Sequence, residues 1–447
     1  MRVWRRGDIF CVEKIYLSAI ITNGVHSMRK SMTRKLTVFF LFLTVTYDFI
    51  YMALDRGILA NELFKRYEYL CSAPIVLLLL PAWFKAETKP LRLKFEYIGI
   101  LSVLPWVVSI AYTVFLVLWV PHAWFGIPSA VQWGTFTAYR AVLAALLVLK
   151  FRDKALDLVT EAVILSYSLT VVYAVAHIGL PGLVQYVSTM NVLVATGYNN
   201  YFEMHQIGET VGLLILWHVF LRKRTNWLTV CALTLIMVLC WKRIGIFAFL
   251  IMMGFYAFLH RRSVSRIYVS LCAVLAGVFT YIALIAGGLL YDLAAVFGFD
   301  FSNRTGIFSF AKQFYEWSVF FPGNGMRYIN RFLYAGWLDR SRSIGQPLGV
   351  MHNDILALYI DLGFIGSVIW FSYHLWLLPR ALQRHYGREV ILIYAVVMVY
   401  YYILCLTDNA LIFFQVQTVI MLLIYEVVRR VYDGGCGELS RGTGRAA

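Results

Sequence analysis

The sequence predicts an all-α, polytopic integral membrane protein, and three observations support this fold class. Hydrophobic residues make up 61% of the 447 residues and charged residues only 14%, whereas soluble domains contain about 45–50% and about 25%. The mean hydropathy is +0.70. Apolar runs of about 20 residues, the length that spans a bilayer, recur along the chain. These features exclude a soluble enzyme, a disordered or collagen-like chain and a disulfide scaffold.

Twelve apolar segments are candidates for transmembrane helices. In chain order they cover roughly residues 36–54, 68–84, 97–121, 128–149, 158–179, 206–221, 226–241, 244–260, 267–291, 351–378, 390–407 and 410–428. The second, seventh and eighth segments are short for a spanning helix. We therefore expect helices 1–9 within residues 36–292 and helices 10–12 within residues 351–428, joined by one long loop at residues 293–350.

The basic residues set the predicted orientation of the chain. A cytoplasmic N-terminus places 28 of the 40 Lys and Arg residues in cytoplasmic segments and 11 in external ones, as the positive-inside rule requires. Both ends are then cytoplasmic, with a basic tail at residues 1–35 and a disordered tail at residues 429–447. Met28 opens a basic stretch that resembles a natural start, so we expect residues 1–27 to be an extension or a dispensable tail.

The charge and cysteine patterns exclude other partners. The formal net charge is +16, but the cations stand in short clusters between apolar runs rather than on a soluble recognition fold, so we expect no nucleic acid partner. The seven cysteines form no C-x-x-C pair, and no cluster has the spacing of metal ligands. We therefore expect no metal and no cofactor.

The loop at residues 293–350 is predicted to be structured and external. It is rich in aromatic residues and glycine, and it is not low in complexity. Apolar residues at helical spacing predict a helix from Arg304 to Phe321. Asn303 is a suitable cap for its start, and Pro322 opens a Gly-rich stretch that ends it. We expect this helix to lie along the outer membrane surface.

Polar residues gather on the predicted external face. They are residues 196–206, Lys242, Arg243, Arg304, Lys312, Glu316, Arg327, Arg331, Arg340, Arg342, His352, Asn353, Asp354, Asp408 and Asn409. Arginine offers planar, bidentate donors to a phosphate, and histidine is a general base near neutral pH. Cations beside an outer membrane surface therefore predict metal-independent group transfer from a phosphorylated lipid.

Each of these residues also has a structural interpretation. Arg243 flanks a helix end and can snorkel to the interface. His352 precedes two good cap residues, Asn353 and Asp354. The loop cations at 327, 331, 340 and 342 fit an ordinary solvated surface, and Arg304 can simply open a helix. Two intramembrane charges, Arg140 and Glu161, are expected to be paired or to line a cavity.

Four motifs resemble those of the O-antigen ligase/polymerase superfamily, over roughly residues 196–425. They are Arg243 followed after ten residues by Gly254, the stretch Asn303–Phe308 with its Arg-Thr pair, the turn Pro322–Gly325, and the stretch His352–Gly366 with its His-Asn and Gly-x-x-Gly elements. They stand in the family's order on the predicted external face. One departure is that the long loop holds no second Arg, ten residues, Gly match.

The resemblance implies a GT-C-like all-helical fold in the bacterial cytoplasmic membrane and transfer of glycan from undecaprenyl diphosphate at the outer face. Carried onto this chain, Arg243 and Arg304 bind the donor diphosphate, and His352 deprotonates or orients the acceptor hydroxyl. The remaining residues are expected to bind substrate or support the site: Lys242, Gly254, Tyr198, Asn199, His205, Arg327, Asn353, Asp354 and Asp408. The chain is most like a Wzy-type polysaccharide polymerase, which makes a chain-length regulator an expected partner.

Three other functions stay open at this point. An O-antigen ligase has the same fold and chemistry but uses lipid A core as the acceptor. A polysaccharide flippase or transporter also fits twelve spans, although transporters place polar groups near the bilayer midplane in repeated halves, and no repeat is visible here. A membrane acyltransferase could use His352, but it has no particular use for the arginine cluster.

Overall fold

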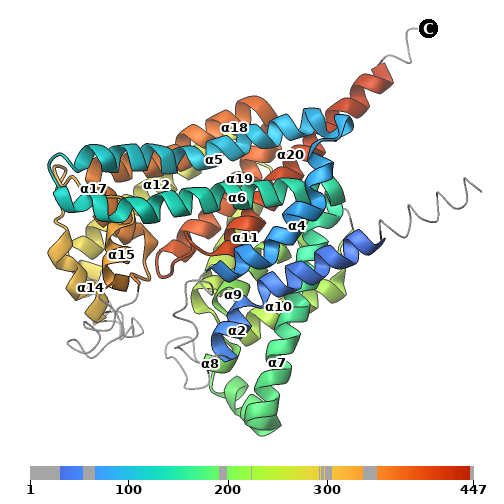
Figure 1. Cartoon of the computed structure of the whole chain (residues 1–447), viewed down its shortest axis with the longest axis horizontal. Coiled ribbons are helices and arrows are strands. Elements are labelled where there is room, and N and C mark those ends of the chain that lie inside the picture. Colours follow the sequence, from blue (N-terminus) through green and yellow to red (C-terminus); the bar gives the residue numbers. More distant parts are fainter. Residues whose placement is uncertain are drawn as a thin grey trace, which may run out of the picture.

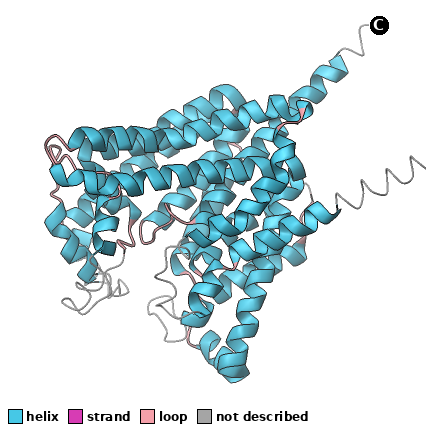
Figure 2. Cartoon of the chain, viewed as in Figure 1, coloured by secondary structure: helices cyan, strands magenta, loops and turns pink. Residues whose placement is uncertain are grey.

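We describe the protein from a computed structural model that places residues 31–53, 66–190, 199–222, 224–290, 292, 296, 305–335 and 350–442. Within these ranges the regular elements are all helices, joined by turns and loops, and none is a strand (Figure 2). The predicted all-α class is therefore confirmed for the described part of the chain. Residues 1–27, Tyr198, Arg304, Arg340 and Arg342 lie outside it.

Each of the twelve predicted apolar segments coincides with helical structure. Residues 31–45 are helical, and the helices that follow are α2 (Tyr47–Ala53), α4 (Tyr67–Trp83), α5 (Lys89–Leu116), α6 (Ile127–Phe151), α7 (Ala155–Ser188), α8 (Asn199–Phe202), α9 (His205–Leu216), α10 (Trp227–Cys240), α11 (Arg243–Leu259), α12 (Val264–Ala286), α14 (Thr305–Ala311), α15 (Tyr328–Ala335), α17 (Asp354–Ser372), α18 (Leu378–Tyr386), α19 (Arg388–Cys405) and α20 (Phe414–Gly442). Short 3-10 turns precede α5, α6 and α7 at Ala86–Thr88, Pro121–Gly126 and Arg152–Lys154. Single π-turns, Trp217–Leu221 and Tyr373–Leu377, follow α9 and α17.

Five helical stretches in the described residues are long and apolar enough to cross a membrane. They are Ala86–Leu116, Pro121–Ser188, Val264–Ala286, Asp354–Tyr386 and Arg388–Cys405. Three shorter apolar helices, α4, α10 and α11, join them. This composition supports a membrane protein, whereas the number of twelve spans and the GT-C-like arrangement stay predictions.

The helices form a bundle in which α19 and α20 run through the centre. Helix α5 packs along α6, α6 and α9 pack on α20, and α11 packs along α19. Figure 1 shows the first described helix and α20 leaving the bundle at the same end, while α14 and α15 lie at the other. Most side chains of α19 are buried, which is why its sequence is apolar on all faces.

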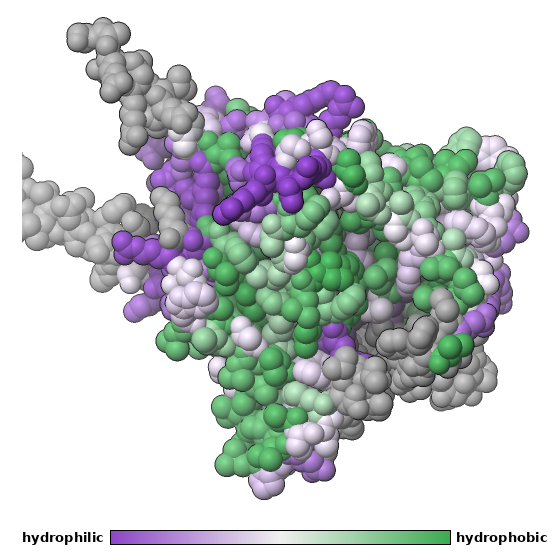
Figure 3. Space-filling model, turned by 180° about the vertical axis from the view of Figure 1, so that it is seen from behind, coloured by the Kyte–Doolittle hydropathy of each residue, from purple (hydrophilic) through white to green (hydrophobic). Residues whose placement is uncertain are grey.

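The outer surface of the bundle is apolar over a broad band. On α5, the side chains of Ile100, Val107 and Val114 point outward and are more than half exposed. Figure 3 shows such residues covering the middle of the molecule, while the most hydrophilic residues gather near the end where the chain leaves the bundle. A monomer in water rarely exposes an apolar patch of this extent, so this band fits contact with lipid.

The predicted helix at 304–321 is wrong in its length. Helix α14 begins at Thr305, continues as a 3-10 turn over Lys312–Phe314, and ends where Tyr315 adopts an extended conformation. The reason lies in a distant residue, Tyr359 of α17. Its hydroxyl donates to the Glu316 carbonyl at 2.7 Å and accepts from the Ser318 amide at 3.4 Å. These bonds hold the chain in an irregular path up to Pro322.

Candidate functional site

The candidate site is centred on a sharp corner between α10 and α11. Helix α10 ends at Cys240, and Trp241 adopts a left-handed conformation with φ of 45°. Lys242 then caps α11 in an extended conformation. A lysine at such a corner would normally reach solvent, but the Lys242 side chain is only 6% exposed. The corner therefore directs a cation into the protein.

The buried ammonium of Lys242 has three polar neighbours among the residues that the structure describes. Its Nζ lies 2.5 Å from Asp408 Oδ2 and 3.5 Å from Glu203 Oε1. It also lies 2.5 Å from His205 Nδ1, to which it donates. Asp408 is 1% exposed, whereas His205 is 45% exposed. A buried ion pair thus stands beneath an imidazole that reaches the surface.

The charge state of the pair follows from its surroundings. Burial raises the pKa of the Asp408 carboxyl, but the Lys242 ammonium, with help from His205 and His352, lowers this pKa well below its usual range. Burial lowers the pKa of Lys242, and Asp408, Glu203 and Glu209 together raise it above its usual value. Both groups are therefore charged at neutral pH.

Asp408 lies in the loop between α19 and α20, and hydrogen bonds fix its position there. Its Oδ1 accepts from the amide of Asn409 at 3.0 Å, and its carbonyl accepts from the amide of Asp354 at 3.3 Å. The carboxylate of Asp354 accepts in turn from the Leu411 amide at 2.6 Å. Hydrogen bonds therefore link the start of α17 and this loop, with each segment donating one bond to the other.

His352 completes the cluster from the residue before the α17 cap. Its φ is 49°, a left-handed conformation that is uncommon outside glycine. Its Nδ1 lies 3.2 Å from the side-chain Nδ2 of Asn409 and 3.6 Å from Asp408 Oδ1, and its side chain is 33% exposed. Asn353 fixes this turn, because its Oδ1 caps α17 at the Leu356 amide and its Nδ2 donates to the Tyr281 hydroxyl at 2.6 Å.

Two small residues bring α9 against the corner. A Cβ added to Gly245 would lie 3.2 Å from the carbonyl oxygen of Gly208, and one added to Gly208 would lie 3.0 Å from Lys242 Cβ. Gly254, the glycine expected to serve substrate binding, has no neighbour within 4 Å of such a Cβ. It lies about 17 Å along α11 from Arg243. The structure thus does not bring Gly254 into the cluster, and Gly245 is the glycine that packing requires there.

Three other predicted residues, Arg243, Arg327 and Asn199, lie in different places in the fold. Arg243 is the first residue of α11 and is half-buried beside Lys242. Arg327 does not join Lys242 directly: it is buried, and its amide donates to Asp361 Oδ2 at 2.8 Å. Its guanidinium lies 5.5 Å from the centre of the Trp133 ring and interacts electrostatically with Asp361 and Asp354. Asn199 opens α8.

The intramembrane charges expected from the sequence have partners. Arg140 is 1% exposed and donates to the carbonyls of Phe136 and Phe413 and to the Thr137 hydroxyl. Glu161 is paired at the surface with Arg34, at 2.5 Å. Neither residue belongs to the Lys242 cluster.

Two carboxylates near the cluster, Glu209 and Asp48, were not selected from the sequence, and a third, Glu203, was included only as part of the polar segment at 196–206. Glu203 contacts Lys242, and Glu209 is fully buried with an electrostatic interaction with both Lys242 and Asp408. Asp48 accepts from the Gln206 amide at 2.7 Å and thereby caps α9 from 158 residues away. Asp48 and Glu209 stand inside apolar segments, where an ionisable residue is costly, and that signal was available in the sequence.

The arrangement can carry acid–base chemistry beside cations. Two imidazoles reach the surface above a buried carboxylate, and Arg243 follows the buried Lys242 in the chain. Among the placed residues, no group of three or more His, Cys, Asp or Glu side chains has the geometry to hold a metal ion. No protein-family model matches the chain, and no curated protein matches it in sequence.

Proposed function

We propose that the chain is a membrane glycosyltransferase that polymerises an O-antigen, a capsule or an exopolysaccharide. It transfers glycan from an undecaprenyl-diphosphate-linked donor to a lipid-linked acceptor repeat unit at the outer face of the bacterial cytoplasmic membrane. The observation that carries the proposal is the convergence of His352, Asp408 and Lys242 from three separate segments, next to Arg243.

The proposed reaction assigns one role to each group. The acceptor hydroxyl gives its proton to His352 Nε2 while its oxygen bonds to the anomeric carbon of the donor sugar. The bond from that carbon to the diphosphate oxygen breaks, and the lipid diphosphate leaves with the electron pair. Arg243 binds the departing diphosphate through paired N–H donors. Asp408 is a positioning residue that keeps the Nδ1 side of His352 turned inward.

The ends of the helices support a site on the outer face. The starts of α9, α11, α17 and α20 and the ends of α10 and α19 meet at the cluster. The opposite ends of these helices carry basic segments around residues 222–224, 260–266 and 380–388. By the positive-inside rule these basic segments face the cytoplasm. The cluster then faces the outside, where the lipid-linked substrates of such a reaction are displayed.

The test is complementation of a strain that lacks this chain, with the glycan ladder read on a gel. Arg243→Ala, Arg304→Ala and His352→Ala are expected to collapse the ladder to a single repeat unit while staying in the membrane. Arg266→Ala and His177→Ala, which change exposed residues outside the cluster, are the matched controls and should keep full ladders.

The other outcomes separate the rival functions. A null strain that still builds full-length lipid-linked polymer, but never attaches it to lipid A core, indicates a ligase with the same site. Normal ladders in all three variants would refute the site assignment and favour a transporter. A membrane abundance assay on each variant distinguishes lost chemistry from lost protein.

A further inference from the structure

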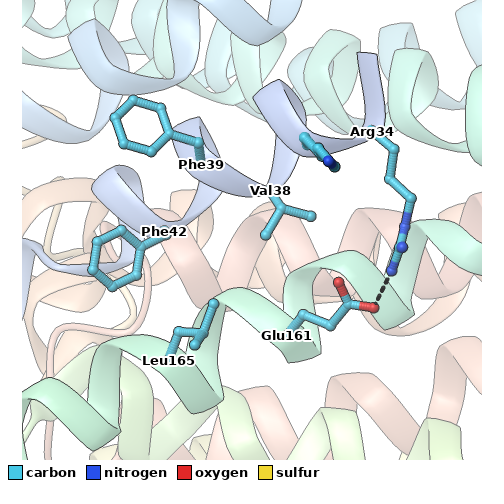
Figure 4. A pocket seen from close by; sticks show the side chains of 7 residues that line it. Arg34, Val38, Phe39, Phe42, Glu161 and Leu165 are labelled. Carbon is cyan, nitrogen blue, oxygen red and sulfur yellow. Dashed lines mark hydrogen bonds and ion pairs between the residues drawn. The ribbon is translucent and has the colours of Figure 1, made fainter. Parts of the chain in front are cut away.

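A groove runs between the first described helix, residues 31–45, and α7. Its volume is about 300 Å³, and it is lined by Arg34, Lys35, Val38, Phe39, Phe42, Glu161 and Leu165. Figure 4 shows Arg34 reaching across one end of the groove to Glu161, while the phenyl rings lie further along the helix. The groove is separate from the Lys242 cluster and shares no residue with it.

The polar end of the groove carries an excess of positive charge. Arg34 Nη2 lies 2.5 Å from Glu161 Oε1, and both side chains are about half exposed, at 54% and 43%. Lys35 is exposed and forms no hydrogen bond or ion pair with the placed residues. Two cations and one carboxylate leave a net charge of +1 at neutral pH.

The remainder of the groove is apolar and ends at Leu165, and an exposed apolar stripe follows it along α7. Leu165, Leu169 and Val172 follow one another at helical spacing, and they are 51%, 39% and 66% exposed. The stripe on α7 ends near Tyr173, whose ring meets the ring of Phe49 edge to face with centroids 5.4 Å apart. From Glu161 to Tyr173 the helix rises about 18 Å, comparable with the about 15 Å depth of one leaflet of the hydrocarbon core.

We propose that this groove binds one anionic phospholipid from the surrounding bilayer. The lipid phosphate lies against Lys35 and Arg34, and one acyl chain follows the stripe of Leu165, Leu169 and Val172. A phosphate satisfies an arginine and a lysine together better than the single carboxylate present. Glu161 competes with the phosphate for Arg34 and therefore limits the affinity. This proposal does not depend on the proposed glycan transfer.

The test is native mass spectrometry of the purified full chain with added dioleoyl phosphatidylglycerol or dioleoyl phosphatidylcholine. The protein is expected to retain the anionic lipid in preference to the zwitterionic one. Arg34→Gln/Lys35→Gln is expected to weaken retention of phosphatidylglycerol about thirtyfold, as the loss of two cations at a membrane surface predicts. Arg261→Gln/Arg266→Gln removes two exposed cations elsewhere and should leave retention unchanged.

Two further variants keep the test decisive if the charge variant does not fold. Leu165→Trp fills the groove from an exposed position and leaves the cations in place, and it should also weaken retention. Glu161→Gln frees Arg34 from its competitor and should strengthen retention, which a purely structural ion pair would not do. Equal retention of both lipids, or equal loss in the control variant, would overturn the proposal.

Discussion

Two ion pairs in this protein have the same length and opposite surroundings. Lys242 and Asp408 are 2.5 Å apart with side chains 6% and 1% exposed, and Arg34 and Glu161 are 2.5 Å apart with side chains about half exposed. The first pair has lost its hydration, so each charge depends on the other. The second keeps water around both partners, so its net contribution to stability is small. The two ion pairs therefore differ in their contribution to stability although their N–O distances are equal.

The largest expected effect comes from breaking the buried pair on one side only. Asp408→Ala leaves the Lys242 ammonium buried without its closest carboxylate, with only the more distant Glu203 remaining at 3.5 Å, and we expect a loss of about 3 kcal/mol in the free energy of unfolding. Lys242→Met should cost about as much for the converse reason. Thermal unfolding of the detergent-solubilised protein measures both.

The double variant Lys242→Met/Asp408→Leu separates stability from function. It removes both buried charges, so its stability should return to within about 1 kcal/mol of the parent protein. Its glycan ladder should stay absent, because His352 has lost the carboxylate beside it. A double variant that is active would show that the pair serves only the fold.

The next effect concerns the two imidazoles above the pair. His352→Ala is expected to lower the transfer rate by about 10²–10⁴-fold, the range for a general base, with little change in the unfolding temperature because its side chain is partly exposed. His205→Ala should give a smaller loss. Rates measured with a lipid-linked repeat unit in proteoliposomes compare them, and equal, small losses would remove His352 from the proposed role.

The sequence was sufficient to locate the helices and to predict which polar residues share one face, because local patterns carry both kinds of information. Hydropathy marks a helix within one segment, and the orientation of basic loops marks the polar residues of one face. This is how Lys242, His205, His352 and Asp408 were selected before their contacts were known. Their meeting around one buried carboxylate depends on the packing of distant helices, which no local pattern contains.

The predicted helix at 304–321 is too long for the same reason. The irregular segment after Phe314 follows from bonds made by Tyr359, which comes 45 residues later. Gly254 was selected by its spacing from Arg243, and its role in substrate binding stays a prediction, while the close approach of α9 and α11 falls on Gly245. The path of the chain after Phe314 and the close approach of α9 and α11 both depend on long-range contacts, which a short sequence motif does not contain.

A smaller and more specific effect is the response of the buried pair to pH. Burial raises the pKa of Asp408, but Lys242 lowers it well below the usual value. The stability from the charged carboxylate is therefore complete above about pH 4, its unfolded pKa, and is lost as the pH falls through the lower folded value. The difference in unfolding temperature between the parent protein and Asp408→Asn should stay constant from about pH 8 to 5. A difference that already shrinks between pH 7 and 5 contradicts this.

The smallest expected effect completes the comparison at the surface pair. Glu161→Gln removes one partner of an ion pair with half-exposed side chains, and water takes over the solvation of Arg34, so the unfolding free energy should change by at most about 1 kcal/mol. The change should shrink further in about 1 M salt, because exposed charges are screened there. Asp408→Asn, measured in the same buffers, should be nearly insensitive to salt. If both variants responded alike to salt, the two pairs would share one electrostatic environment, and burial would not be what separates them.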